Sequence, residues 1–359
     1  MSEKIRIMQQ LVHRIARHLF QGVRTLFRPR PSFAKKPRHD TSLPSNSLLS
    51  KKKTADLHRR LFEHFQKQYD FRFNLLTEEA EFRLKDSDLP FRTVDRRVFN
   101  TLTIDAVDNG LGAWSVDVER LLHSEWLPLH PPLADYMNRL PEWDGEDRIL
   151  PLARRISSLP VWEKGFRVWL RSLAAQWLGL PLITANALVP LLVSQSQGLR
   201  KSTFCRSLMP PALADYYTEH LHLTTTGSVE AQMTKLGLIN LDEFDRFTAR
   251  QMSMLKNLLQ LPRICRRRAY RQQYLSLSRT ASFIATSNEV QLLTDLTGSR
   301  RFLCIEVVAP IDCSDIDHAQ LYAQLRAELS AGLPTHLTRE EEAELQAHNR
   351  AFQITSPAA

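Results

Sequence analysis

The sequence predicts an α/β fold built around a parallel sheet, with helical flanks and a small α/β domain ahead of it. Three apolar runs support this prediction, at residues 191–193, 236–241 and 281–287, because each is followed directly by polar residues. Segments with helical spacing separate the runs, which favours parallel strands joined by helices. The carboxyl ends of such strands meet at one edge of the sheet, where ligands bind. We therefore expect the polar residues after the runs to form one site.

The first run opens the stretch that organises the chain, LLVSQSQGLRKSTFCRSL at residues 191–208. A short polar loop with one glycine, Gly198, follows the strand, and Lys201-Ser202-Thr203 then begins a helix. This layout is typical of a phosphate-binding P-loop, in which backbone N–H groups and a helix N-terminus hold anionic oxygens. The lysine adds positive charge near the β- and γ-phosphates, and the hydroxyl after it, that of Ser202, binds Mg²⁺. The residues expected to bind ATP are Gln197, Gly198, Leu199, Arg200, Lys201, Ser202 and Thr203.

The loop departs from the pattern G-x-x-x-x-G-K-[ST] at both glycine positions, which hold Gln195 and Arg200. Glycine suits these positions because the backbone there takes conformations, or approaches the ligand, in ways that a side chain hinders. The stretch alone therefore leaves an alternative open, a helix start that binds no nucleotide. Whether such a loop hydrolyses ATP is also left open.

The second run ends in adjacent carboxylates, Asp242 and Glu243, as a Walker B element requires. We expect Asp242 to lie in the outer shell of Mg²⁺ and Glu243 to act as the general base that polarises the attacking water. A purely structural role for both acids is the alternative, because Asp-Glu after an apolar run is common.

The third run ends at Asn288, which is placed to orient water or the γ-phosphate as a sensor residue does. Arg300 and Arg301 follow, just before a further apolar strand at 303–308. An arginine pair in this place is expected to supply a finger to the nucleotide of a neighbouring subunit. The alternative is that both arginines pair with acidic residues of their own subunit.

A basic cluster lies between the second and third runs. Five arginines fall within nine residues, beside tyrosines that could stack on bases. We expect a hairpin or loop that grips nucleic-acid phosphates, and a solvated basic turn is the alternative. The residues expected to contact nucleic acid are Arg263, Arg266, Arg267, Arg268, Tyr270 and Arg271.

Charge is unevenly distributed along the 359 residues. Residues 1–53 hold 13 Lys and Arg against Glu3 and Asp40, whereas the whole chain has a net charge of +9, so the rest is slightly acidic. No apolar run is long enough to span a membrane, so no integral membrane association is expected. The four cysteines show no metal-binding spacing, which indicates free thiols in a reducing cytoplasm and no zinc site.

Four parts are expected along the chain: a basic leader and disordered linker at 1–53, a small domain at 54–142, the ATPase core at 143–310 and a C-terminal helical extension at 311–359. The spacing in the leader fits a basic amphipathic helix at 3–27, with a weakly folded, solvated segment as the alternative, and the linker covers 28–50. Further expected helices and strands are a helix at 55–69, paired strands at 69–76 and 80–84, and helices at 93–109, 115–124, 161–178, 228–233 and 249–259.

Five motifs occur in one order and together resemble the virulence-associated protein E (VapE/VirE) family. They are WDGEDRI (143–149), QGLRKSTF (197–204), INLDEFD (239–245), ATSNE (285–289) and TGSRRF (297–302). The resemblance covers residues 70–355 and is strongest to the form found in Bacteroidetes-type bacteria, where a segment like 340–353 recurs. It implies a P-loop ATPase of the AAA+ or superfamily-three-helicase type, with Lys201 and Ser202 on phosphate and Mg²⁺. It also implies a Walker B pair, a sensor and a finger at the positions given above.

The function expected from these features is that of an ATP-dependent, ring-forming, helicase-like motor on DNA, single-stranded DNA in particular. It would serve replication of a phage, plasmid or integrated element, with a primase or other replication protein as a possible partner. One alternative is a non-hydrolysing nucleic-acid-binding or scaffold protein derived from such an ATPase, which the altered glycines favour. Another is a nucleotide-regulated switch without unwinding activity.

Overall fold

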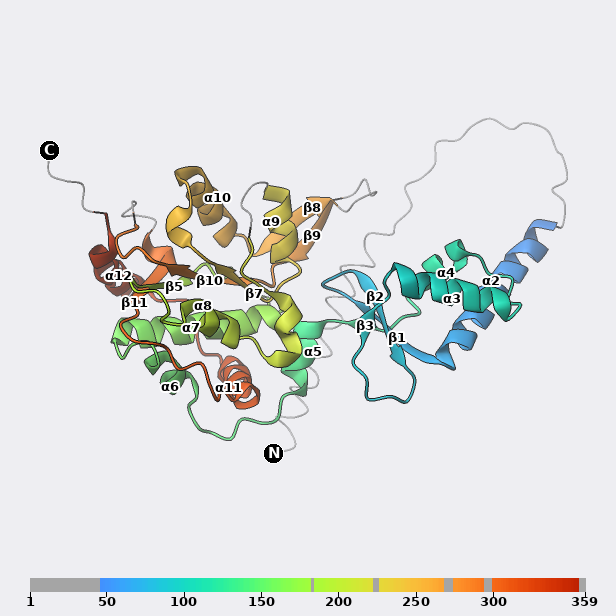
Figure 1. The fold of residues 1–359 in the computed structure, drawn as a ribbon, viewed down its shortest axis with the longest axis horizontal. Helices are drawn as coiled ribbons and strands as arrows, with labels where there is room; N and C mark the ends of the chain where they lie inside the picture. The colour runs from blue at the N-terminus through green and yellow to red at the C-terminus, as the bar shows by residue number, and fades with distance from the viewer. Residues whose placement is uncertain (1–45, 182–183, 222–225, 268–273, 294–298, 355–359) are drawn as a thin grey trace. The chain divides into compact units, whose positions relative to one another are not determined.

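The computed structural model describes residues 46–181, 184–221, 226–267, 274–293 and 299–354, and Figure 1 shows their fold. The predicted leader helix and most of the predicted linker lie outside the described residues. The end of the linker prediction is wrong, because helix α2 (Asn46–Gln66) already begins at Asn46. This segment contains neither proline nor glycine after Pro44, so nothing in it breaks a helix.

The largest sheet has five strands, all parallel, in the order β11-β5-β10-β7-β6. The three predicted apolar strands form its centre: β5 (Val189–Val193), β10 (Ser282–Ser287) and β7 (Leu238–Leu241). The outer strands are β11 (Phe302–Glu306) and β6 (Tyr217–Thr218). The prediction of an α/β fold with a parallel sheet is therefore confirmed.

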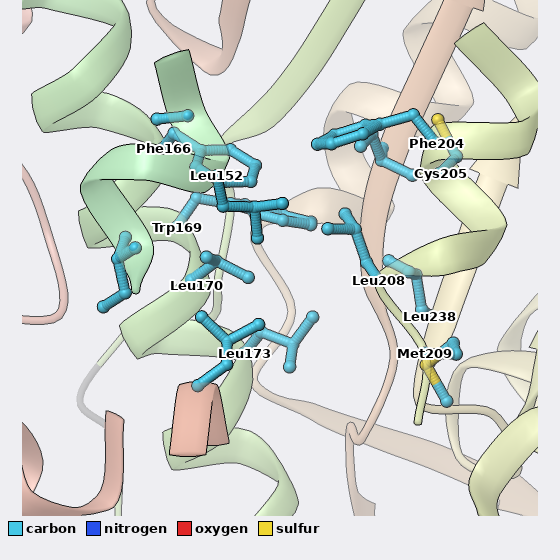
Figure 2. Close-up of a cluster of buried hydrophobic side chains, with 14 of the residues drawn as sticks. Leu152, Phe166, Trp169, Leu170, Leu173, Phe204, Cys205, Leu208, Met209 and Leu238 are labelled. Carbon is cyan, nitrogen blue, oxygen red and sulfur yellow. The ribbon is translucent and has the colours of Figure 1, made fainter. Parts of the chain in front are cut away.

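Both faces of this sheet are buried, because successive residues of each strand enter opposite cores. Leu192 and Ile284 belong to one core, whereas their neighbours Leu191 and Phe283 belong to the other. The first core is completed by α7 (Pro160–Trp177) and α8 (Lys201–Ser207), and Figure 2 shows their side chains meeting across it. The second is covered by α9 (Thr226–Met233) and α10 (Ala249–Leu259).

Helix α7 is the main support of the first core. Its aromatic residues Trp162, Phe166 and Trp169 are fully buried and stacked on one another, with ring centroids 5.1 and 5.6 Å apart. Side chains of this size each remove about 150–250 Å² from water. The indole N–H of Trp169 also donates to the carbonyl oxygen of Phe283 at 3.0 Å, which ties the helix to strand β10.

The C-terminal residues form two helices, α11 (His318–Ser330) and α12 (Arg339–His348), followed by the short helix η4 (Asn349–Phe352). The predicted C-terminal helical extension thus consists of separate helices, with α11 and α12 divided at 331–338. Tyr322 of α11 is buried, stacks on Trp177 at 5.0 Å and donates its hydroxyl to the carbonyl oxygen of Leu208 at 2.9 Å. Helices α11 and α12 are therefore part of the first core, together with α5 (Pro132–Arg139) and α6 (Ile149–Arg154), whereas Phe352 of η4 belongs to the second.

The N-terminal residues of the described chain contain a second sheet, in the order β3-β2-β1-β4. The predicted strand pair is confirmed as antiparallel β1 (Tyr69–Asn74) and β2 (Glu79–Leu84). The predicted helix start at 93 is wrong: residues 92–93 form β3, and the Asp95 side chain caps α3 (Arg96–Asp108). The remaining elements are β4 (Leu129–His130) and α4 (Ser115–Leu122). Among the described residues, no helix is both long and apolar enough to cross a membrane.

Candidate functional site

A cleft of about 290 Å³ lies where the carboxyl ends of β5, β7 and β10 meet the start of α8. The loop Gln197–Thr203, the acids Asp242 and Glu243, and the strand end Thr286–Asn288 line it. All of the residues that the sequence predicts for the nucleotide loop, the acidic pair and the sensor therefore come together. The parallel sheet order explains this convergence, because β5 and β7 each lie beside β10.

Lys201 is held by three oxygen acceptors at the floor of this cleft. Its Nζ donates to the side-chain oxygen of Asn288 at 3.0 Å, and to the hydroxyl and carbonyl oxygens of Ser194 at 3.2 and 3.3 Å. Burial lowers the pKa of the lysine, and the nearby carboxylates of Asp242 and Asp245 oppose that shift. Because the three direct acceptors are neutral, an anionic oxygen can compete with them for the ammonium group.

Ser202 and Asp242 meet at the other side of the loop. The Ser202 hydroxyl donates to Oδ1 of Asp242 at 3.0 Å, and the Thr286 hydroxyl donates to the same oxygen. Asp242 is thereby fixed between α8 and the end of β10. A hydroxyl and a carboxylate are the oxygen ligands that Mg²⁺ prefers in proteins, so this pair fits the metal of a bound nucleotide.

Glu243 has an exposed side chain, and its Oε2 pairs with the guanidinium of Arg246 at 2.6 Å. Its backbone is left-handed, with φ 51°, and the short helix η2 (Phe244–Arg246) begins immediately after it. The carboxylate must leave Arg246 before it can accept a proton from water. Exposed ion pairs of this kind contribute only about 0–1 kcal/mol, so the exchange is not a large barrier.

The two substituted glycine positions differ in backbone conformation. Arg200 is left-handed, with φ 63° and ψ 25°, and Gly198 close by has φ 79°. Gln195 is not among the described residues that have positive φ. The left-handed region costs a residue with a side chain about 1–2 kcal/mol, so the strain that the sequence pattern implies falls on Arg200 alone.

Four side chains of the site were not foreseen from the sequence: Ser194, Asp245, Thr286 and Ser287. Oδ1 of Asp245 accepts hydrogen bonds from the Ser287 hydroxyl at 2.9 Å and from the Asn288 backbone N–H at 3.1 Å. Ser194 and Thr286 lie at the ends of apolar strands, as Asp242 and Asn288 do. Polar residues at or just beyond a strand end were the signal that could have identified them.

Arg300 and Arg301 lie away from this cleft. They belong to the short helix η3 (Ser299–Arg301), which precedes β11, so they lie at the amino edge of the sheet. The Arg300 guanidinium is 3.8 Å from a carboxylate oxygen of Glu342, and both arginines line a separate cleft with His336. The pairing of Arg300 with Glu342 is the contact expected if the arginine has a structural role in its own subunit. That an arginine acts as a finger on the nucleotide of a neighbouring subunit stays a prediction.

The basic cluster lies on a hairpin of two antiparallel strands, β8 (Arg263–Arg267) and β9 (Tyr274–Ser278). The Arg263 guanidinium donates to the hydroxyl and carbonyl oxygens of Ser276, each at 2.8 Å, and so braces the hairpin itself. Arg266 and Arg267 are residues of β8. Arg268, Tyr270 and Arg271 lie outside the described residues.

Comparison with known proteins gives one family and several similar structures. A family model described as the virulence-associated protein E-like domain matches residues 137–354. The apo structure of the NrS-1 C-terminal region (305–718) is 13% identical, with a TM-score of 0.46 over 83% of this chain and 75% of that chain. An A-form apo structure of the same region is 12% identical, with a TM-score of 0.41 over 82% and 66%. No curated protein matches the chain significantly.

Proposed function

The chain belongs to the virulence-associated protein E-like family, and from that premise we propose that it is a P-loop ATPase that acts as a helicase-like motor on DNA. The observation that supports this most strongly is the convergence of Lys201, Ser202, Asp242 and Asn288 on one cleft. Lys201 and Ser202 begin the helix that follows β5, whereas Asp242 and Asn288 directly follow the neighbouring parallel strands β7 and β10. A lysine, a hydroxyl, a carboxylate and an amide in this arrangement are the groups that phosphoryl transfer from ATP needs.

In the proposed reaction Lys201 exchanges its bond to Asn288 for a phosphate oxygen, and the freed amide orients the attacking water. Glu243 leaves Arg246 and takes the proton of that water as the bond between the γ-phosphate and the ADP oxygen breaks. Mg²⁺ held through Ser202 and Asp242 would supply positive charge beside the β- and γ-phosphates. Backbone N–H groups of the loop Gln197–Thr203 hold the phosphates at the start of α8.

The motor part of the proposal depends on the hairpin β8–β9 and on a ring. The hairpin is proposed to contact the DNA backbone through its arginines, single-stranded DNA being the expected form. Arg300 or Arg301 is proposed to reach the nucleotide of the adjacent subunit. The process served is replication of a mobile element in the bacterial cytoplasm, with a primase or other replication protein as partner.

The proposal is tested by ATP hydrolysis with and without single-stranded DNA, measured beside ATP binding. Lys201→Ala is expected to abolish binding, whereas Glu243→Gln keeps binding and lowers turnover by about 10²–10⁴-fold, because it removes the base and keeps the shape. Lys235→Ala, between α9 and β7, is the matched control and is expected to behave as wild type. Unchanged affinity in Lys201→Ala would contradict the site.

A second candidate function is that of a non-hydrolysing nucleic-acid-binding or scaffold protein. The left-handed backbone of Arg200, at a position that favours glycine, supports it. Wild-type protein that binds DNA but hydrolyses no ATP under any DNA condition would favour this candidate. Nucleotide-dependent DNA binding without unwinding would favour a switch instead.

A further inference from the structure

Asp245 links two of the strands that build the site. It lies in η2, three residues beyond Asp242, and its Oδ1 accepts both the Ser287 hydroxyl and the Asn288 backbone N–H. Through this one carboxylate oxygen, the segment that follows β7 is hydrogen-bonded to the end of β10. Ser287 also accepts the backbone N–H of Glu289 at 3.0 Å, so the backbone on both sides of Asn288 is fixed.

The side chain of Asn288 extends from this fixed backbone toward Lys201, 3.0 Å away. In the proposed reaction this amide leaves the lysine and orients the attacking water, so it can be displaced only slightly before the water no longer faces the γ-phosphate. Misplacement of a reacting or orienting group by about 1 Å can lower a rate by about 10²-fold. The hydrogen bonds of Asp245 therefore bear on catalysis although it does not line the nucleotide cleft.

We propose that Asp245 is the positioning residue for Asn288, acting through the two hydrogen bonds that its Oδ1 accepts. This inference rests on the proposed ATPase function and adds a residue that the proposed reaction does not name. Its role is to hold the sensor amide where the γ-phosphate arrives, without contacting the nucleotide. This role requires the position of the Asp245 oxygen atom and does not require its negative charge.

Two substitutions separate the place of the oxygen from the charge. Asp245→Asn removes the charge but keeps a carbonyl oxygen that can accept both hydrogen bonds. Asp245→Glu keeps the charge and moves the oxygens by one methylene group. A role through charge predicts that Glu is tolerated and Asn is not, whereas positioning predicts the reverse.

The experiment uses the full chain and measures kcat, the Kd for ATP and the thermal midpoint for each variant. Asp245→Glu is expected to lower kcat by at least about 10-fold with less than about a 3-fold change in Kd, because ground-state binding is kept and transition-state orientation is impaired. Asp245→Asn is expected to keep kcat within about 3-fold of wild type. Asp95→Ala, which removes a carboxylate cap from α3, is the control for a stability loss without a change in kcat.

The outcomes are distinct. Loss of kcat in Asp245→Asn with none in Asp245→Glu would overturn positioning in favour of charge. Equal kcat in both variants and wild type would overturn this inference alone and leave the ATPase function standing. Wild-type protein without turnover would overturn the ATPase function and this inference with it.

Discussion

The two edges of the five-stranded sheet both hold polar side chains, but these side chains have different kinds of partner. At the carboxyl edge, Lys201 contacts Ser194 and Asn288, and Ser202 contacts Asp242, so the partners are mainly other side chains. At the amino edge, Arg279 is only 2% exposed and donates to three backbone carbonyl oxygens, those of Ala281, Leu259 and Asn186.

Three further side chains, those of Ser282, Gln176 and Asn186, extend the network at the amino edge. Ser282 donates its hydroxyl to Gln176 at 3.0 Å and accepts from the amide of Asn186 at 2.9 Å, and all three are buried. Backbone carbonyls cannot rotate away, so such a network rigidifies the fold and costs a great deal to break. Side-chain partners can exchange for a ligand. We therefore assign ligand binding to the carboxyl edge of the sheet and structural support to the amino edge.

The prediction with the largest expected effect tests this assignment, because a catalytic role for the amino edge would contradict it. Arg300 and Arg301 lie at the amino edge, yet a finger acting on a neighbour's nucleotide contributes about 10³–10⁵ in rate. Arg300→Ala and Glu243→Gln subunits are each expected to be inactive alone. Mixed together, some interfaces join an intact Glu243 to an intact Arg300, so partial ATPase activity should return in a phosphate-release assay.

The same mixing is repeated with Arg301→Ala, because either arginine can supply the finger. Glu342→Ala is the matched control, since it removes the observed partner of Arg300 and leaves both guanidiniums in place. If mixing restores nothing for either arginine while both variants still assemble, the amino edge has only a supporting role.

The next effect is on stability. Arg279→Met is expected to lower the free energy of unfolding by about 3–5 kcal/mol, because it removes the Arg279 donor from three buried carbonyl groups, and among the described residues only that of Ala281 keeps another donor, the Gln176 amide at 3.5 Å. Lys201→Met is expected to change it by no more than about 1 kcal/mol, since its side-chain partners can turn to one another or to water. Denaturant titration of both variants measures the difference. Equal losses would remove the distinction between the two edges.

The three central strands could be predicted because they are apolar runs, and the main site residues could be predicted because they follow those runs. Lys201, Asp242 and Asn288 follow three such runs, and parallel strands bring their carboxyl ends together. Asp245 could not be predicted, because its bond to Asn288 depends on β7 and β10 being neighbours, which the sheet order decides. Arg279 was missed for a related reason: its three acceptors come from segments far apart in the sequence.

A smaller effect tests the hairpin that begins near the amino edge. Removing one phosphate-binding cation should flatten the slope of log K against log [salt] for single-stranded DNA by about 0.7. Replacing Arg266 and Arg267 together by glutamine is therefore expected to flatten the slope by about 1.4. Arg263→Gln is the matched comparison, because its guanidinium already braces Ser276 and should change the slope less. An unaltered slope in the double variant would indicate a solvated basic turn.

The smallest expected effect concerns the strained backbone at the carboxyl edge. Arg200→Gly relieves about 1–2 kcal/mol of left-handed strain but gives the unfolded chain about 0.4–1 kcal/mol of additional entropy, so stability should rise by up to about 1.6 kcal/mol. Asp86→Gly, at another left-handed position outside the site, should gain less, because aspartate tolerates this conformation better. If the Arg200 side chain also hinders the phosphates, ATP turnover will rise in Arg200→Gly and stay unchanged in Asp86→Gly. A gain in stability without a gain in turnover would mean that the loop accepts arginine at the expense of strain alone, because only the backbone N–H of residue 200 faces the phosphates.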